Sequence, residues 1–505
     1  MDIEGCIEVL EAVLKDRGLL AQVPEETRIA LLTAAGRVSH PTRLESIKLS
    51  RAIRAQNRRQ LDAQDRKTRA STTIRRTRAA GVFVAPARVL IGQAPQEERE
   101  LQKPRFCYVC KAEFRKLHFF YDSMCPSCAE FNYAKRHQSA PLHGRVALVT
   151  GARIKIGYQT ALMLLRAGAG VVATTRFPRD AALRYSREPD FNAWKDRLRI
   201  HGLDLRHFPS VELFTRYLTS SHERLDVLIN NAAQTVRRPP GFYAHLLERE
   251  TSPLADEPPE IQALLESHEA CVKVLSAGAT KELGNGNAAD VCGLALRGAK
   301  GPGMGLTHSA ILSQIKYTLD DALGEEVFPA GKTDADLQQV DLREKNSWRL
   351  TLAEVSSAEM LELQLINSVA PFILCSKLKP LMLRHPTNEK HIVNVSAMEG
   401  SFSRGTKTDK HPHTNMAKAA LNMLTLTSAP DYAKSGIYMN AVDTGWVSDE
   451  DPALHAARKK DELDFQPPLD IVDGAARVCD PVFSGLLSGQ HSWGIFFKDY
   501  KPTPW

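Results

Sequence analysis

Short apolar runs alternate with longer amphipathic stretches over the last two thirds of the chain. The runs 146–149 and 171–175 are followed by further runs at 225–229 and 392–395. Each is short and mainly apolar, as expected of a strand that is buried on both faces of a sheet. The intervening stretches have helical patterns. The alternation therefore predicts βαβ units and an α/β fold with a doubly wound parallel sheet over 143–505.

The first hundred residues have a helical pattern instead. Apolar residues recur at helical spacing from Ile7 to Leu14, and a second short helix is expected over 24–36. The stretch from Arg43 to Arg78 predicts one long helix with only a thin apolar face. We therefore expect residues 1–100 to form a helical, basic N-terminal region.

Charge is concentrated in that long helix. The chain has a formal net charge of +7, and the stretch from Arg43 to Arg78 holds twelve lysines and arginines against three acidic residues. This local excess of +9 leaves the rest of the chain near −2. The helix is thus a candidate site for an acidic protein or for non-specific nucleic-acid binding; the alternative is a solvated face without a partner.

Composition sets the broad class of the protein. The 505 residues are 43% hydrophobic and 25% charged, enough for a large core and more than one domain. We see no apolar run of about 18 residues, and the acidic start of the chain lacks the pattern of a signal peptide. Nine cysteines, an odd number, do not suggest a disulfide framework. A cytoplasmic protein without membrane contact is expected.

A cysteine-rich module is predicted over 104–137. Two Cys-x2-Cys pairs are separated by fourteen residues, which matches a tetrahedral zinc site, and each pair can turn two thiolates inward from one tight knuckle. His118 is an alternative ligand, and thiols without metal are the alternative interpretation. Because no open coordination position is implied, we expect structural zinc, as in a zinc ribbon. The four expected ligands are Cys107, Cys110, Cys125 and Cys128.

A glycine-containing loop, 150–157, lies between the first expected strand and a helix, where a phosphate-binding loop belongs. Other polar positions follow it in a characteristic order: Asp204, Asn230 to Ala233, Asn367, Asn394 to Ser396, Lys418 and Asn440 to Val447. Taken together, this ordered set resembles the short-chain dehydrogenase/reductase family. The resemblance extends from about His143 to the end of the chain, apart from one insertion.

The resemblance implies a Rossmann fold and a dinucleotide site. Glycines shape the loop and bring the helix N-terminus to the pyrophosphate, an aspartate meets the adenine, and the lysine meets the nicotinamide ribose. Arg176 ends the second strand, where NAD-specific members carry an acidic residue, so a cation there favours NADP. Lys155 replaces the middle glycine of the loop. The residues expected to bind the cofactor are Gly151, Arg153, Lys155, Gly157, Arg176, Asp204, Asn230, Ala232 and Lys418.

The catalytic positions depart from the family pattern. The family serine falls at Ala397, next to Ser396, and the family tyrosine falls at Thr414. A threonine hydroxyl is far less acidic than a phenol and is a poor proton donor. Lys418 and Asn367 are retained. The remaining candidates for a proton-transfer or hydrogen-bonding role are Ser396, Thr414, His411 and His413.

An insertion of about 234–355 is the other departure from the family. It contains glycine-rich segments at 284–287 and 298–305, and Ser356 is expected to cap the helix that follows. We weigh two interpretations of the insertion. It forms either a lid or partner surface near the substrate entrance, or a disordered loop.

These observations lead to a functional expectation. The chain is predicted to be an NADP-dependent oxidoreductase with a non-standard proton donor, acting on a small-molecule carbonyl or alcohol and forming a homo-oligomer. The first alternative is a catalytically degenerate NADP-binding regulatory or scaffold protein. The second is a nucleic-acid-associated factor built on the basic helix and the zinc module.

Overall fold

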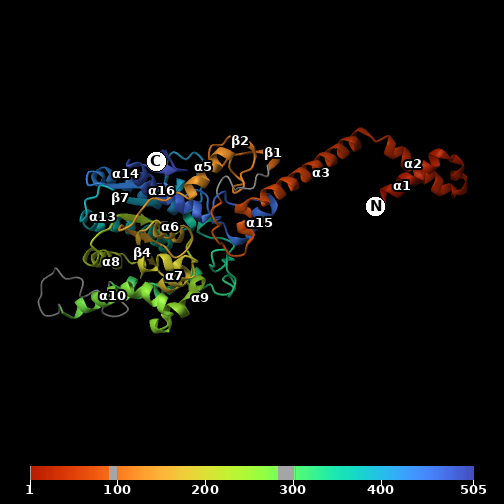
Figure 1. The fold of residues 1–505 in the computed structure, drawn as a ribbon. Helices are drawn as coiled ribbons and strands as arrows, with labels where there is room; N and C mark the ends of the chain where they lie inside the picture. Colours follow the sequence, from red (N-terminus) through yellow and green to blue (C-terminus); the bar gives the residue numbers. More distant parts are fainter. Residues whose placement is uncertain (1, 90–98, 282–300, 302) are drawn as a thin grey trace. The chain divides into compact units, whose positions relative to one another are not determined.

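The computed structural model describes residues 2–89, 99–281, 301 and 303–505 (Figure 1). The chain forms two compact units, Met1–Lys67 and Thr68–Trp505. The cysteine module and the parallel sheet both belong to the second unit.

The first unit is helical. It contains α1 (Ile3–Lys15), α2 (Glu25–Ser39) and most of α3 (Arg43–Ala70), and neither α1 nor α2 has a buried residue.

The expectation of a single helix from Arg43 to Arg78 is wrong. Helix α3 ends at Ala70 and α4 (Thr73–Ala79) begins after a break. At the break the hydroxyls of Ser71 and Thr72 donate to backbone carbonyls three residues earlier. The backbone N–H groups of Thr73 and Ile74 donate to carbonyls of the cysteine module instead of continuing the helix.

The second unit contains an eight-stranded sheet in the order β10-β9-β8-β7-β6-β3-β4-β5. Strands β3 to β9 are parallel, and only β10 is antiparallel to its neighbour. This confirms the predicted α/β fold with a doubly wound parallel sheet. The strands are β3 (Val146–Thr150), β4 (Gly170–Thr175), β5 (Leu198–Gly202), β6 (Val227–Asn230), β7 (Lys390–Ser396), β8 (Ile437–Asp443), β9 (Phe496–Lys498) and β10 (Lys501–Thr503).

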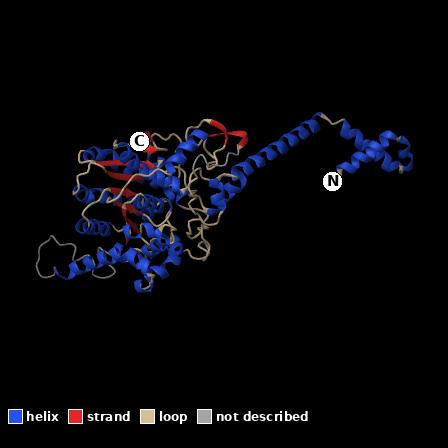
Figure 2. Ribbon diagram, viewed as in Figure 1, coloured by secondary structure: helices blue, strands red, loops and turns tan. Residues whose placement is uncertain are grey.

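Helices cover both faces of the sheet (Figure 2). Ala147 and Val149 of β3 pack in one core cluster with α6 (Lys155–Arg166), α7 (Pro178–Ser186) and α16 (Ile471–Ser488). Leu148, between them, packs in a second cluster with α8 (Phe208–Ser221), α13 (Ala370–Leu383) and α14 (Pro412–Ala433). Side chains therefore alternate between two buried faces, which explains why the centres of the strands are mainly apolar.

The described parts of the insertion are folded. They include α9 (Pro240–Thr251), α10 (Pro259–Lys281), which packs on β5, and α11 (Met304–Thr307). Arg237 joins the insertion to α12 (Ser357–Gln364) through buried ion pairs with Asp321, at 2.5 Å, and Glu362, at 2.8 Å. The glycine-rich segment 284–287 and part of 298–305 lie outside the described residues. The side chain of Ser356 caps α12 as expected.

The cysteine module consists of an antiparallel pair, β1 (Glu100–Phe106) and β2 (Glu113–Lys116), followed by α5 (Pro126–Arg136). The first cysteine pair lies in the turn between the strands. The expectation of a second, similar knuckle is wrong, because Cys125 is the N-cap of α5 and Cys128 lies in its first turn. Helix α5 packs on α16, so the module is attached to the α/β sheet.

One helical stretch, Ser357–Leu383, is long and apolar enough to cross a membrane by length and composition alone, with a mean hydropathy of 1.3. We had expected no such stretch. It is 56% buried, and its α13 part packs on α8 beside the sheet. These contacts are those of a core helix of the α/β unit.

Candidate functional site

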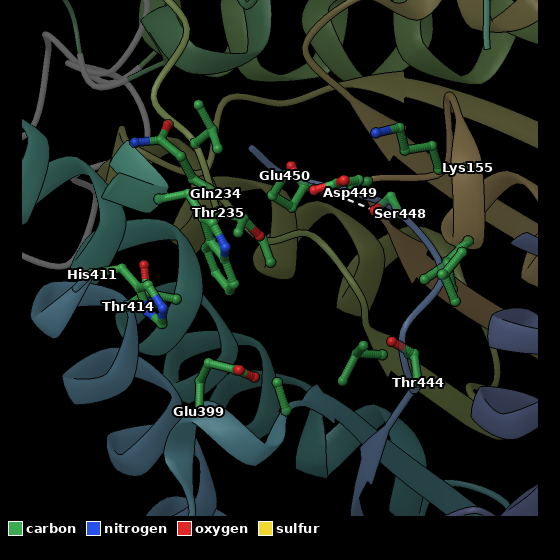
Figure 3. A pocket seen from close by; sticks show the side chains of 18 of the residues that line it. Lys155, Gln234, Thr235, Glu399, His411, Thr414, Thr444, Ser448, Asp449 and Glu450 are labelled. Carbon is green, nitrogen blue, oxygen red and sulfur yellow. Dashed lines mark hydrogen bonds between the residues drawn. The ribbon is translucent and has the colours of Figure 1, made fainter. Parts of the chain in front are cut away.

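A cavity of about 1210 Å³ opens at the carboxyl ends of the parallel strands. It is lined by residues that follow β3, β4, β5, β6, β7 and β8. Strand β3 has β4 on one side and β6 on the other, so the strand order reverses at this point. Ligands of open α/β sheets bind in the crevice at such a switch point. Figure 3 shows His411 and Thr414 on one side of the view and Lys155 on the other.

The glycine loop has the close packing expected of it. Gly151 has a φ of 66°, and a Cβ there would lie 2.8 Å from the Cα of Ala232. A Cβ on Gly157 would lie 2.3 Å from the carbonyl oxygen of Gly151. Side chains at both positions are therefore excluded by the backbone, and α6 begins close to β3.

Lys155 occupies a position that is unusual for its side chain. It begins α6 with a φ of 53°, in the left-handed region that glycine adopts readily. Its side chain lines the cavity. Burial disfavours its charge, but the carboxylates of Glu450 and Asp336 outweigh this and raise the pKa of Lys155. The loop therefore keeps the backbone conformation that a glycine would adopt at this position, and Lys155 adds a positive charge.

The two expected arginines have different surroundings. Arg153 is 6% exposed, and it donates to Asp180 at 2.6 Å and to Gln338 at 2.5 Å. Arg176 donates to the hydroxyl of Tyr243 at 2.7 Å, and its guanidinium lies 4.6 Å from the centre of that ring. Within the described ranges Arg176 makes no direct ion pair, and it lines the cavity, where its charge helps to lower the pKa of Asp204.

Asp204 lies at the cavity but is already engaged. Its buried carboxylate accepts from the Arg206 guanidinium at 2.6 Å, and Arg206 also pairs with Glu362. Burial alone would raise the pKa of Asp204, but Arg206 holds it below its usual value. The sequence contained no sign of this arginine clamp.

Two further expected residues connect the strands. The amide of Asn230 donates to Asn394 Oδ1 at 2.8 Å and so links β6 to β7. The backbone N–H of Ala232 donates to Thr150 Oγ1 at 3.0 Å. These contacts connect neighbouring strands beside the cavity, which Ala232 lines.

Lys418 reaches the cavity from α14. Its ammonium donates to the carbonyl of Val395 at 2.7 Å, and burial lowers its pKa to about 8. Thr414, one turn earlier, lines the cavity with a buried hydroxyl that has no hydrogen-bond partner among the described residues. Ser396 and Ala397 also line the cavity, and the hydroxyl of Ser396 donates to Asn422 at 2.5 Å.

Asn367 lies in a π-helical turn, Leu365–Val369, between α12 and α13. Its side-chain oxygen accepts from the backbone N–H of Gln234 at 2.8 Å, and its amide donates to the carbonyl of Gln234. Gln234 lines the cavity, but Asn367 is not among the described residues that do so. Asn367 therefore acts on the cavity through Gln234.

The two candidate histidines are separated by the structure. His413 is directed at Glu359, 3.3 Å away, and is not among the described residues that line the cavity. His411 lines it and stacks on Trp348 with ring centres 3.9 Å apart. Burial lowers the pKa of His411. Only His411 of this pair can meet a ligand in the cavity.

Sequence reasoning gave no role to several residues of the cavity, among them Asp443, which lies in the stretch Asn440 to Val447, and Glu399 and Tyr108. Asp443, at the end of β8, is buried and accepts from the N–H groups of Met398 and Gly445, at 2.7 and 2.6 Å, and burial raises its pKa. Glu399 comes from the turn after β7. Tyr108 comes from the cysteine module, more than 300 residues away in sequence from its neighbour Trp446. No local pattern indicates a contact of that kind.

The four expected cysteines come together. Their sulfur atoms all lie within 4.8 Å of one another, and those of Cys110 and Cys125 are 3.7 Å apart. This spacing suits four thiolates around one tetrahedral ion. His118 is not part of the group; it packs among aromatic rings, and burial lowers its pKa to about 4.

Comparison with sequence families gives two matches. Residues 145–249 match the family described as short chain dehydrogenase, and residues 344–466 match the one described as enoyl-(acyl carrier protein) reductase. The two matched segments lie on either side of most of the insertion.

Individual relatives differ in how much they share. The uncharacterized protein R665 of Acanthamoeba polyphaga mimivirus is 30% identical over 408 residues, which cover 79% of this chain and 74% of the viral protein. Mouse retinol dehydrogenase 13 is 36% identical over 96 residues, and human dehydrogenase/reductase SDR family member 13 is 42% identical over 93. These cover 19% and 18% of this chain, and the chain spans only 28% and 24% of those two proteins.

Solved structures were also compared. A Pseudomonas aeruginosa RhlG/NADP active-site complex has a TM-score of 0.41 at 17% identity, over 71% of this chain and 95% of that one. An NADPH-bound carbonyl reductase from chicken fatty liver has a TM-score of 0.39 at 17% identity, over 72% of this chain and all of that one.

Proposed function

Because the chain belongs to the short-chain dehydrogenase/reductase family, we propose that it is an NADP-dependent oxidoreductase. Its substrate would be a small carbonyl compound or the corresponding alcohol. The observation that carries this proposal is the cavity at the switch point of the sheet, where the glycine loop lies together with Arg176, which makes no direct ion pair with a described residue. A loop at a helix N-terminus beside such a cation suits a dinucleotide with an additional phosphate.

The chain's own residues fit such a ligand. Gly151 and Gly157 leave the backbone free to approach a pyrophosphate at the start of α6, and Lys155 adds positive charge there. Arg176 would meet the 2′-phosphate, while Arg153, held by Asp180, would support the wall behind it. Lys418 would donate to ribose hydroxyls.

The bound cofactor would supply hydride to a substrate carbon, and the protein must then meet the negative charge that develops on the substrate oxygen. The family's two donors are replaced by Ala397 and Thr414. Thr414 offers a weak donor without a hydrogen-bond partner among the described residues, and His411 contributes an imidazole to the lining of the cavity. We assign a non-standard proton donor to this pair of residues.

A second function is favoured by the same replacements. A protein that binds NADP but has lost ordinary catalysis would need the glycine loop, Arg176 and Lys418, and all three are present. It would not need the serine and the tyrosine. A regulatory or scaffold role is therefore the alternative, and turnover distinguishes it from the first.

The cysteine module is proposed to bind one structural zinc ion. Four sulfur ligands from two short segments leave no open position for substrate. The ion would hold the turn between β1 and β2 against the first turn of α5, in a module whose own core is small.

Titration of the purified full-length protein with NADPH, followed by the change in cofactor fluorescence, tests the proposal. We expect saturable binding of one NADPH per chain, and turnover with a panel of aldehydes and ketones then separates enzyme from binding protein. Absence of saturable binding would refute both functions.

A further inference from the structure

Tyr108 belongs to two sites at once. It lies between the first two cysteines, in the turn that joins β1 to β2, and its side chain lines the cavity. Its hydroxyl accepts from the backbone N–H of Trp446 at 3.0 Å. A single side chain thus connects the cysteine centre to the turn that follows β8.

That turn is part of the cavity wall. We call residues 443–451 the wall segment; all of them line the cavity. Gly445, in its centre, has a φ of 76°, and a Cβ there would lie 3.1 Å from the Tyr108 hydroxyl and 2.5 Å from Leu469. The phenol is therefore packed directly against the backbone of the wall.

The chain beyond the wall segment is held by the same part of the molecule. Arg136 of α5 makes a buried two-pronged contact with Asp470, at 2.5 and 2.8 Å. Arg78 of α4 donates to the carbonyl of Leu469 at 2.5 Å, and Tyr121 donates to Asp473, also at 2.5 Å. Leu469 packs in the core cluster that contains Cys107 and Cys125. The module thus holds both ends of the stretch 446–470.

We propose that Tyr108 is a positioning residue that couples the cysteine centre to the cofactor cavity, so that a metal ion bound by the four cysteines and a dinucleotide bound in the cavity stabilise each other. The inference rests on the proposed function. A metal ion orders the turn that carries Tyr108, and Tyr108 then fixes the Trp446 N–H and the wall segment. By thermodynamic linkage, a dinucleotide that binds only to the ordered wall segment must also raise the affinity of the cysteine centre for the metal ion.

If Tyr108 only helped to pack the cysteine module, its hydroxyl would not be needed. Packing requires the aromatic ring of Tyr108, but coupling requires its hydroxyl, the group that accepts from Trp446. Tyr108→Phe keeps the ring and the four cysteines and removes only that hydroxyl. Phe106→Leu is the matched control, because Phe106 precedes the same cysteine pair, is 74% exposed and is not among the described residues lining the cavity.

The experiment measures two quantities on the full-length, zinc-loaded protein. One is the NADPH dissociation constant, from cofactor fluorescence. The other is the rate of zinc transfer to a chromophoric chelator with and without NADPH. For the wild type we expect NADPH to slow zinc release. For Tyr108→Phe we expect unchanged zinc content, two- to tenfold weaker NADPH binding, as is typical of one lost hydrogen bond, and a smaller effect of NADPH on zinc release. Phe106→Leu should match the wild type.

The outcomes separate the two proposals. No NADPH binding by the zinc-loaded wild type would remove the proposed function and the coupling with it. A second outcome would overturn the coupling alone. In it, the wild type and Tyr108→Phe bind NADPH equally well, and NADPH does not change the rate of zinc release from the wild type. If Tyr108→Phe fails to fold, amide hydrogen exchange of residues 443–451 in the wild type decides. Equal exchange in the zinc-loaded and zinc-depleted proteins would contradict the coupling.

Discussion

Arg176 is the predicted main determinant of NADP binding and Arg153 a further predicted cofactor-binding residue, and the two differ in their surroundings. Arg153 forms an ion pair with Asp180, whereas the described contacts of the Arg176 guanidinium are with the Tyr243 hydroxyl and with the Tyr243 and Phe177 rings. We predict that Arg176→Gln weakens NADPH binding about 10- to 100-fold, because a charged hydrogen bond contributes about 1.5–3 kcal/mol. NADH binding should change little and serves as the internal control. Equal losses for the two cofactors, measured by fluorescence titration, would contradict a 2′-phosphate contact.

The pKa of Lys418 gives a pH prediction. Burial lowers this pKa from 10.5 to about 8, so the ammonium form exists below about pH 8 and is lost above it. If the ammonium donates to ribose hydroxyls, NADPH binding weakens as pH rises through that value. Titrations from pH 6.5 to 9.5 should show this loss in the wild type and a smaller one in Lys418→Met. The same loss in both proteins would assign it to another group.

At the scale of residues, the sequence predicted only features that depend on a short stretch of chain. The roles of Gly151 and Gly157 depend on backbone spacing, and the structure has that spacing. The engagement of Asp204 by Arg206 and the cavity contact of Tyr108 could not be predicted. Both depend on which segments meet after folding.

At the scale of elements, the strands were well predicted because each is buried on both faces and its pattern is local. The break between α3 and α4 falls at Ser71 and Thr72, residues that favour helix ends, but the single helix was predicted from the charge pattern, which continues across them. The competing hydrogen bonds to Phe119 and Phe120 come from a module that is distant in sequence.

The cysteine module carries the metal prediction. The purified protein should contain one zinc ion per chain by elemental analysis, and Cys125→Ser should lose it together with thermal stability, because metal binding is coupled to folding. Cys6→Ser is the control, since Cys6 is exposed and outside the group. Zinc retained in Cys125→Ser, or absent from the wild type, would contradict the assignment.

The basic helix α3 carries a separate prediction. Two arginines at the C-terminal end of the predicted segment already make contacts within the protein. Arg75 forms an ion pair with Asp122, and Arg78 donates to backbone carbonyls. The positive residues from Arg43 to Arg59 are exposed and are the candidates for a partner. If they bind nucleic acid, low-salt retardation of duplex DNA should fall steeply as salt is raised, because counterions are released from phosphate. A protein that does not retard DNA at low salt would leave a solvated helix as the interpretation.

At the scale of the whole molecule, buried charges connect the insertion to the nucleotide site. Asp204 pairs with Arg206, Arg206 with Glu362, and Glu362 with Arg237, which reaches Asp321 in the insertion. The insertion also supplies Tyr243 beside Arg176. For the insertion, the sequence alone left a lid or partner surface and a disordered loop as alternatives. The described parts of the insertion are folded and form part of the cavity wall. They are held by contacts between residues too distant in sequence to be predicted.

The central claim is that this site binds NADP but lacks the usual proton donors. The most direct test is to measure turnover of the wild type and of the double variant Ala397→Ser, Thr414→Tyr. NADPH consumption with a panel of aldehydes and ketones should be very slow or absent in the wild type, although NADPH binds. The double variant should be faster, because a general acid contributes about 10²–10⁴-fold in rate, with Lys418 already in place. His411→Ala should abolish any residual wild-type activity. Rapid wild-type turnover that survives His411→Ala, or a double variant that binds NADPH but gains no activity, would contradict the account.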